Sequence, residues 1–366
     1  MLEATLREAN ELYVFFSLLA KGEVNMGDSQ GECAGCAPLV AVVRHEHDGL
    51  RKYIIGADEV SVKIGDSDCS FPREDFAAAS EWILQAIQQA PKAENGKKTM
   101  VDFSDIEPFL DALQIFDMEA QTDDRTHLHL QLWHCDAPLM GIRIQSLLCG
   151  YQPLLAGGRT SNIKFEQTGV RFSSPAVHKI NWTEQPENVA EVGRRILYIQ
   201  SMGGQLKFSD VADKIFKSNL LMIDTNLPRI LASMLMTLFI DGTARIDELT
   251  AIMEEKNPLK VKEELVRKHG FYAHKMRQLL LASAWGMRPT KQYQGLPSAV
   301  YGYLMVDRKG QVLLYSRADE QTFADYLFHH TRFEKGLPDE EKFGYLEREN
   351  GAYYLKLNLK IGLLKR

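Results

Sequence analysis

The chain contains 366 residues, of which 45% are hydrophobic and 25% are charged. This composition excludes a disordered, collagen-like or coiled-coil protein, and the length suits two or three domains or one large domain with insertions. The net charge of −6 is unevenly distributed, with −13 over residues 1–259 and +7 over residues 260–366. A basic C-terminal third fits either a polyanionic ligand or a chance asymmetry on a solvated surface.

The cysteine content and the apolar segments bear on the compartment of the protein. Five cysteines in so long a chain do not indicate a secreted disulfide framework. Two acids precede the apolar run near the N-terminus, which is not the pattern of a secretory signal. The longest apolar stretch, Leu227 to Ile240, contains Pro228 and Arg229 and is too short to span a bilayer. We therefore expect a cytoplasmic protein without a membrane partner.

The N-terminal part of the chain alternates between helical and extended patterns. Helical periodicity runs from Leu2 to Leu19 and ends at Gly22, and a second helix begins at Pro72 and stops before Pro91. Further elements are short: strands at 39–43, 53–55 and 60–64, and a helix at 106–113. Turn residues between the strands indicate antiparallel pairing.

The centre of the chain predicts a β-hairpin with one polar face. Residues 127–134 alternate, with His127, His129 and Gln131 on the side opposite the leucines. After a turn at 136–138, residues 140–146 alternate in the same way and place Arg143 and Gln145 together. A Gly-rich loop at 150–162 and a short strand at 163–166 follow.

The rest of the chain is mostly helical and then extended again. We expect helices at 187–201, 208–220, 223–240, 244–255, 270–285 and 322–330, and strands at 299–305, 312–315, 343–347 and 353–359. This order predicts an α+β fold rather than alternating βαβ units. The predicted parts are 1–180, 181–290 and 291–366, and one continuous domain remains an alternative.

Several motifs allow a structural as well as a functional interpretation. Cys33 and Cys36 form a CxxC pair, but no second pair accompanies them, so an ordinary loop is the simpler hypothesis. His127 and His129 share a strand face and would suit a metal, while a polar sheet face is the commoner arrangement. The glycines beside Arg159 and Thr160 fit either close approach to a phosphate or a tight turn.

A set of short motifs occurs in a fixed order over most of the chain. The central block consists of Gly141–Ser146, Leu154–Ala156 and Thr160–Asn162, and the opening helix contains Glu11–Phe16. Other matching segments are Pro38–Arg44, Asn219–Leu220, Leu227–Pro228, Asn257–Leu259, Gly286–Pro289, Asp325–Phe328 and Leu357–Leu359. No single segment is specific, but in their ordered occurrence the chain resembles the HpaII family of type II restriction endonucleases.

The resemblance implies a PD-(D/E)XK-like core: a mixed sheet with a central β-hairpin, flanking helices and a helical block. It also implies Mg²⁺-dependent cleavage of duplex DNA within 5′-CCGG-3′. In such enzymes acidic side chains on the hairpin hold the metal, and a lysine orients the attacking water. The resemblance assigns the catalytic positions to Asp124, His127, Arg143 and Gln145.

The sequence departs from the family pattern at these positions. Where the family has D-K-x-D, this chain has Asp124, Arg125, Thr126 and His127, and Gln145 occupies the lysine position. Because Mg²⁺ prefers carboxylates, a face of His, Arg and Gln offers it little. The candidate metal ligands are therefore Glu11 and Asp124, with Asp136 and Glu166 as other carboxylates and a softer metal on the histidines as an alternative.

The loop after the hairpin carries the candidate DNA-binding residues. They are Arg159, Thr160, Asn162 and Lys164, together with Ser146 of the family motif. Arginine binds guanine with two hydrogen bonds, and Asn or Thr contacts neighbouring base edges. The partners implied by the family are duplex DNA, a second copy of the chain and a cognate cytosine methyltransferase.

Three hypotheses follow. The chain is a restriction endonuclease with a rearranged metal site, in which Mg²⁺ is the cofactor. Alternatively, it is a homologue or subunit that binds DNA without cutting it and needs no cofactor. In the third, it shares only the scaffold and has a partner other than DNA.

Overall fold

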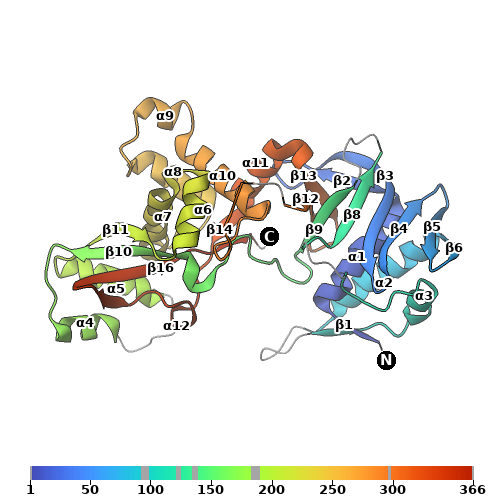
Figure 1. Ribbon diagram of the computed structural model, residues 1–366, viewed down its shortest axis with the longest axis horizontal. Helices are drawn as coiled ribbons and strands as arrows, with labels where there is room; N and C mark the ends of the chain where they lie inside the picture. The colour runs from blue at the N-terminus through green and yellow to red at the C-terminus, as the bar shows by residue number, and fades with distance from the viewer. Residues whose placement is uncertain are drawn as a thin grey trace. The chain divides into compact units, whose positions relative to one another are not determined.

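The computed structural model describes residues 2–91, 99–120, 125–133, 139–182, 190–295 and 298–364. The chain folds into two compact units (Figure 1). Unit 1 comprises residues 1–151, 297–323 and 365, and unit 2 comprises 152–296, 324–364 and 366. The boundaries expected near 180 and 290 do not coincide with this division, because the C-terminal segment contributes strands to both units.

Unit 1 contains a mixed sheet with helices on one face. Its elements are β1 (Glu3–Thr5), α1 (Leu6–Lys21), β2 (Glu23–Gly27), β3 (Cys33–Glu46), β4 (Gly49–Ile55), β5 (Glu59–Ile64), β6 (Ser67–Pro72), α2 (Arg73–Gln89), β7 (Met100–Asp102), α3 (Glu107–Ala112), β8 (Leu128–Leu132), β9 (Met140–Ser146), β12 (Val300–Val306), β13 (Val312–Ser316) and the 3-10 helix η2 (Arg317–Asp319).

The large sheet of unit 1 has the strand order β2-β13-β12-β9-β8-β3-β4-β5-β6. Because β2 also pairs with β3, six of these strands form a closed circuit, and β4, β5 and β6 extend from it. All neighbouring pairs are antiparallel except β12 with β9 and β13 with β2. The hairpin β8–β9 therefore lies inside the sheet, and its second strand is held by a strand from the C-terminal part of the chain.

Local signals in the sequence account for the first two helices. Thr5 and Glu8 form a reciprocal capping box at the start of α1, and Gly22 ends it in the left-handed conformation with φ 65°. Pro72 precedes α2 directly. Both helices bury apolar side chains in the core between themselves and the sheet, including Phe15, Phe16 and Phe76. These predicted helices are confirmed with small shifts of their ends.

Unit 2 combines an antiparallel sheet with a set of helices. Its elements are η1 (Gly158–Ser161), β10 (Asn162–Thr168), α4 (Ser174–Asn181), α5 (Ala190–Ser201), β11 (Gln205–Val211), α6 (Lys214–Ile223), α7 (Leu227–Asp241), α8 (Ile246–Lys256), α9 (Glu263–Arg267), α10 (Phe271–Ala284), β14 (Thr331–Phe333), α12 (Pro338–Glu341), β15 (Leu346–Glu349), β16 (Ala352–Asn358) and β17 (Ile361–Leu363). The boundary between the units falls within α11 (Glu320–His330).

The sheet of unit 2 has the order β11-β10-β16-β15, and β14 pairs separately with β17. The α+β prediction is confirmed. Two local predictions were wrong: the helix expected at 208–220 begins only at Lys214, because residues 205–211 form β11, and the CxxC pair lies at the start of β3 rather than in a loop. In β11 the half-buried Leu206 and Phe208 alternate with exposed residues, and the strand pairs with β10, so this period-two pattern outweighs the helical one.

Among the described helices, none alone is long and apolar enough to cross a membrane. Helices α6 and α7 pass the same test only as a pair, bent by 108° at the break between them.

Candidate functional site

The predicted hairpin is present in unit 1. Strands β8 and β9 pair with Leu128 opposite Ile142 and Leu130 opposite Met140, and these four side chains belong to the apolar core. Because side chains alternate along a strand, Arg143 and Gln145 lie on the opposite face. The prediction of one apolar and one polar face is confirmed. The turn, with His134 and Asp136, lies outside the described residues.

The polar face of β9 is completed by a strand distant in sequence. Strand β12 runs parallel to β9 and places Tyr303 opposite Arg143 and Met305 opposite Gln145. Tyr303 is buried, and its side chain is hydrogen-bonded to the Arg143 guanidinium. Gln145 and Ser146 are buried as well, and the Ser146 hydroxyl accepts a hydrogen bond of 3.1 Å from the Leu148 amide. Because Tyr303 belongs to β12, the Arg143 guanidinium is held by a neighbouring strand of the same sheet.

His127 stands next to this face as a neutral side chain. Its Nδ1 accepts a hydrogen bond of 3.0 Å from the Ile144 amide, so its hydrogen is on Nε2. Burial, with the nearby positive charge of Arg143, lowers the pKa of His127 to about 3. At neutral pH this imidazole can donate a hydrogen bond from Nε2, but it carries no charge and its Nδ1 is occupied.

Glu11, a candidate metal ligand, belongs to a buried charged cluster of unit 1. Its carboxylate accepts a hydrogen bond of 2.7 Å from the Ala120 amide and lies 3.7 Å from Arg44, which pairs with Glu46 at 2.6 Å. Two acids thus share one guanidinium in the interior. Burial raises the pKa of Glu11 to about 7, although the charge of Arg44 opposes this.

The described residues do not supply a site that fits Mg²⁺. No group of three or more His, Cys, Asp or Glu side chains within them is arranged to hold a metal. The described polar face carries His, Arg and Gln, whereas Mg²⁺ prefers carboxylate oxygens. Asp124, a candidate in both the catalytic and the metal set, lies outside the described residues. Its predicted roles stay predictions.

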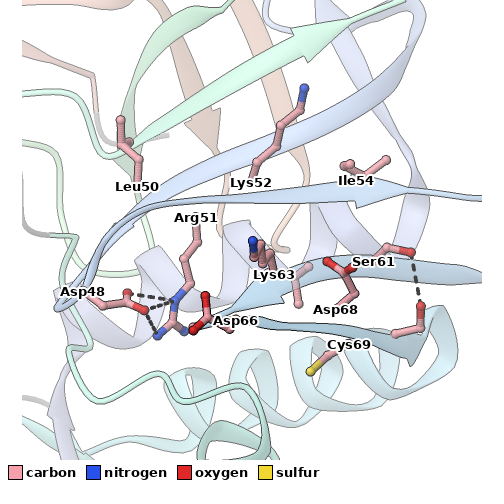
Figure 2. A pocket seen from close by; sticks show the side chains of 13 residues that line it. Asp48, Leu50, Arg51, Lys52, Ile54, Ser61, Lys63, Asp66, Asp68 and Cys69 are labelled. Atoms are coloured by element: carbon pink, nitrogen blue, oxygen red, sulfur yellow. Dashed lines mark hydrogen bonds and ion pairs between the residues drawn. The ribbon is translucent and has the colours of Figure 1, made fainter.

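A hollow of unit 1 lies elsewhere, over the strands β4, β5 and β6 (Figure 2). It encloses about 940 Å³ and contains none of the predicted site residues. Acids and bases alternate there: Asp48 pairs with Arg51 at 2.8 Å, and Lys63 is opposite Asp68 across the strands. This mixture of charges does not favour a polyanion.

The candidate DNA-binding loop lies in unit 2. Arg159 is exposed on the short helix η1, and the Thr160 hydroxyl donates to the Gly157 carbonyl at 2.7 Å. Asn162 is 1% exposed, and its amide nitrogen donates to the carbonyls of Glu341 and Lys342. Since both amide hydrogens are used inside the unit, a contact from Asn162 to a base would require these bonds to break.

Lys164 lies on a face of the unit 2 sheet that carries both charges. It forms an ion pair with Glu349, and its ammonium stands 3.8 Å from the centre of the Tyr354 ring. Its neighbour Lys356 pairs with Glu347 and Glu349. This part of the sheet is not a basic patch, so Lys164 would have to leave Glu349 to reach a phosphate.

The two units differ in charge. Unit 1 has 28 acidic and 16 basic side chains, a net of −12, and unit 2 has 21 and 27, a net of +6. The basic asymmetry seen along the chain thus belongs to one compact body. A positive body of this kind attracts a polyanion such as duplex DNA.

Comparisons with known proteins give the family. The model of the HpaII restriction endonuclease family matches residues 5–363. The chain belongs to the HpaII restriction endonuclease family. The type II restriction enzyme HpaII of Haemophilus parainfluenzae is 28% identical over 363 residues, which cover 98% of this chain and 97% of that protein. No solved structure matches the chain.

Membership of the HpaII family applies to both units, because the match begins in β1 and ends in β17. The polar hairpin face of unit 1 and the basic unit 2 are therefore parts of one family fold. The PD-(D/E)XK character of the sheet remains a prediction.

Two residues that support the site, Tyr303 and Asn358, were not predicted from the sequence. Tyr303 holds Arg143, and the buried Asn358 donates to the Gly158 carbonyl at 2.7 Å and to the Asn162 side chain at 2.8 Å. Neither has a local signal, because each acts on a segment far away in the sequence. The segment containing Asn358 did appear among the motifs shared with the HpaII family, but without a role.

Proposed function

We propose that this protein is a type II restriction endonuclease that hydrolyses phosphodiester bonds of duplex DNA, with 5′-CCGG-3′ as its recognition sequence. The observation that carries the proposal is the match to the HpaII family across nearly the whole chain. The positive charge of unit 2 supports a polyanionic substrate.

In this proposal the polar face of β9 meets the scissile phosphate. The guanidinium of Arg143, held by Tyr303, supplies a fixed positive charge for the negative charge that develops on phosphorus oxygens during attack by water. Gln145 occupies the family's lysine position and contributes an amide rather than a charge. Neutral His127 offers a hydrogen bond from Nε2. We assign Mg²⁺ as the cofactor, with Asp124 as the carboxylate to bind it.

The test combines cleavage and binding. Purified protein is incubated with labelled CCGG and scrambled duplexes in Mg²⁺, in Mn²⁺ and in a chelator, and products and shifted complexes are measured. We expect cutting of the CCGG duplex with metal only. Arg143→Gln should reduce the rate by about 10²-fold or more, as expected for loss of a transition-state donor. Lys63→Gln, in the mixed-charge hollow of unit 1, is the control.

A specific observation supports a second candidate function. The described polar face of the hairpin contains no carboxylate and does not fit Mg²⁺. We therefore keep the alternative of a DNA-binding homologue or subunit of a restriction system that does not cut. A CCGG-selective shift without products in either metal would favour it, and no shift with any duplex would contradict both candidates.

The proposed partners follow from a restriction system. They are duplex DNA, a second copy of the chain to match the palindrome, and a cognate cytosine methyltransferase that protects the host DNA in the cytoplasm. Sedimentation with and without the duplex would test the second copy.

A further inference from the structure

Two stretches of the chain lack acidic residues altogether. No Asp or Glu occurs between Ala137 and Phe165, or between Leu265 and Val306. The first stretch carries Arg159 on η1, and the second carries Arg288 and Lys291 in the connection after α10. In unit 2 these stretches come together.

The two stretches meet where the backbone of Gly157 packs against the ring of Pro289. A Cβ atom on Gly157 would lie 2.5 Å from the Cβ of Pro289, so only glycine allows this packing. Pro289 is buried, whereas Arg159 and Lys291 are exposed. Because Pro289 lies between Arg288 and Lys291 in sequence, the packing brings three cations onto neighbouring surface segments.

The turn that carries Arg288 and Lys291 is fixed from inside. The amide nitrogen of Asn219, 1% exposed on α6, donates to the carbonyls of Arg288 and Lys291 at 2.7 and 2.8 Å. The Asn219 oxygen accepts from the Tyr293 amide at 2.9 Å. Asn358 holds η1 in the same way through the Gly158 carbonyl at 2.7 Å. Buried asparagines thus hold both basic segments.

The three cations of these segments have no acidic partner in the part of the chain that the structure describes. Among the described residues, no carboxylate forms an ion pair with Arg159, Arg288 or Lys291, in contrast to Lys164, which pairs with Glu349. Burial lowers the pKa of Arg288. On the other side of η1, Lys342 follows the acidic residues of α12, so we leave it out of the cluster.

We propose that Arg159, Arg288 and Lys291 form a phosphate-binding surface that positions the backbone of duplex DNA on unit 2. This surface rests on the proposed function, since it names where that substrate is held. Contacts to phosphates set the register and affinity without reading the sequence. Two held segments with exposed cations suit this task, because little further ordering is needed on binding.

The experiment measures binding of CCGG and scrambled duplexes by fluorescence anisotropy in EDTA, at salt concentrations from about 50 to 200 mM. For Arg288→Gln/Lys291→Gln we expect affinity about tenfold weaker or more for both duplexes. The slope of log K against log salt should become shallower by about 1 for each lost contact. Arg159→Gln should add to this effect.

A matched control distinguishes binding of phosphate at this surface from an effect of the total charge of unit 2. Arg267→Gln/Lys268→Gln removes the same charge from exposed residues of unit 2 that pair with Glu263 and Glu264. We expect its salt slope to equal that of the unchanged protein. Gly157→Ala, which keeps every charge, should weaken binding to both duplexes because the two segments can no longer pack.

The outcomes are distinct. If the unchanged protein binds no duplex, the proposed function fails. If it binds but Arg288→Gln/Lys291→Gln keeps the full salt slope, the phosphate-binding surface is refuted. An equal loss in the Arg267→Gln/Lys268→Gln control would also refute it. All four substituted cations in these variants are at least partly exposed, so folding is not at stake.

Discussion

Unit 1 and unit 2 differ in net charge and in the side chains that hold their charged segments. Unit 1 has a net charge of −12 and encloses a charged cluster, in which Arg44 lies between Glu11 and Glu46. Unit 2 has a net charge of +6; besides Arg195 it buries uncharged asparagines, and the segments that these asparagines hold expose cations. A buried charge needs a partner, whereas a buried amide needs only hydrogen bonds. Arg159, Arg288 and Lys291, which form no ion pair with the described carboxylates, are thereby left for a ligand.

The largest effect on stability is expected in unit 1 from Arg44→Met. Removing the guanidinium leaves Glu11 and Glu46 buried without their shared partner, so the free energy of unfolding should fall by about 3–5 kcal/mol. Urea denaturation measures this. Arg267→Met, in an exposed pair, should cost less than about 1 kcal/mol. A loss of less than about 1 kcal/mol for Arg44→Met would show that Glu11 and Glu46 do not depend on Arg44 as a buried partner.

The second effect is a pH dependence from Glu11. Its pKa in the folded protein is about 7, above its ordinary value of 4.5, so folding favours the protonated form. This contribution to stability is complete below about pH 4.5 and is lost as the pH rises through about 7, by about 3 kcal/mol.

Urea denaturation of the unchanged protein and of Glu11→Gln between pH 5 and pH 8 tests this dependence. Glu11→Gln should remove most of the fall in stability with pH, while the control Glu81→Gln, exposed on α2, should keep it. Parallel curves for the unchanged protein and Glu11→Gln would contradict the prediction.

The third effect shows whether Asn162 stabilises the fold or contacts DNA bases. A carboxylate cannot donate to the carbonyls of Glu341 and Lys342, so Asn162→Asp should lower the free energy of unfolding by about 2–3 kcal/mol. Thermal unfolding without DNA measures it. Normal stability with lost CCGG selectivity would instead assign Asn162 to the recognition of bases.

The smallest effect is expected for Lys164→Gln. Its pair with Glu349 is partly exposed, so stability should change by less than about 1 kcal/mol. Because Lys164 is already paired, the salt slope of DNA binding should also stay unchanged. A slope shallower by about 1 would place Lys164 among the phosphate contacts and widen the basic surface of unit 2.

The sequence predicted elements whose signals are local. The capping pattern at Thr5 and Glu8, the glycine after α1 and the alternation in residues 127–146 each act over a few residues, and the structure has α1, β8 and β9 there. The family resemblance also came from sequence alone, since ordered segments survive where single residues change. The helix predicted to begin at residue 208 was wrong, because residues 205–211 pair with β10 as the strand β11.

The sequence and the tertiary structure determined different features of this protein. The sequence by itself determined the amounts of charge, the acid-free stretches and the polar face of the hairpin. Only the tertiary structure decided that β12 returns to lie beside β9, that Tyr303 holds Arg143, and that Asn219 and Asn358 hold the basic segments. These contacts join residues far apart along the chain, and their stability comes from burial that exists only once both partners are folded.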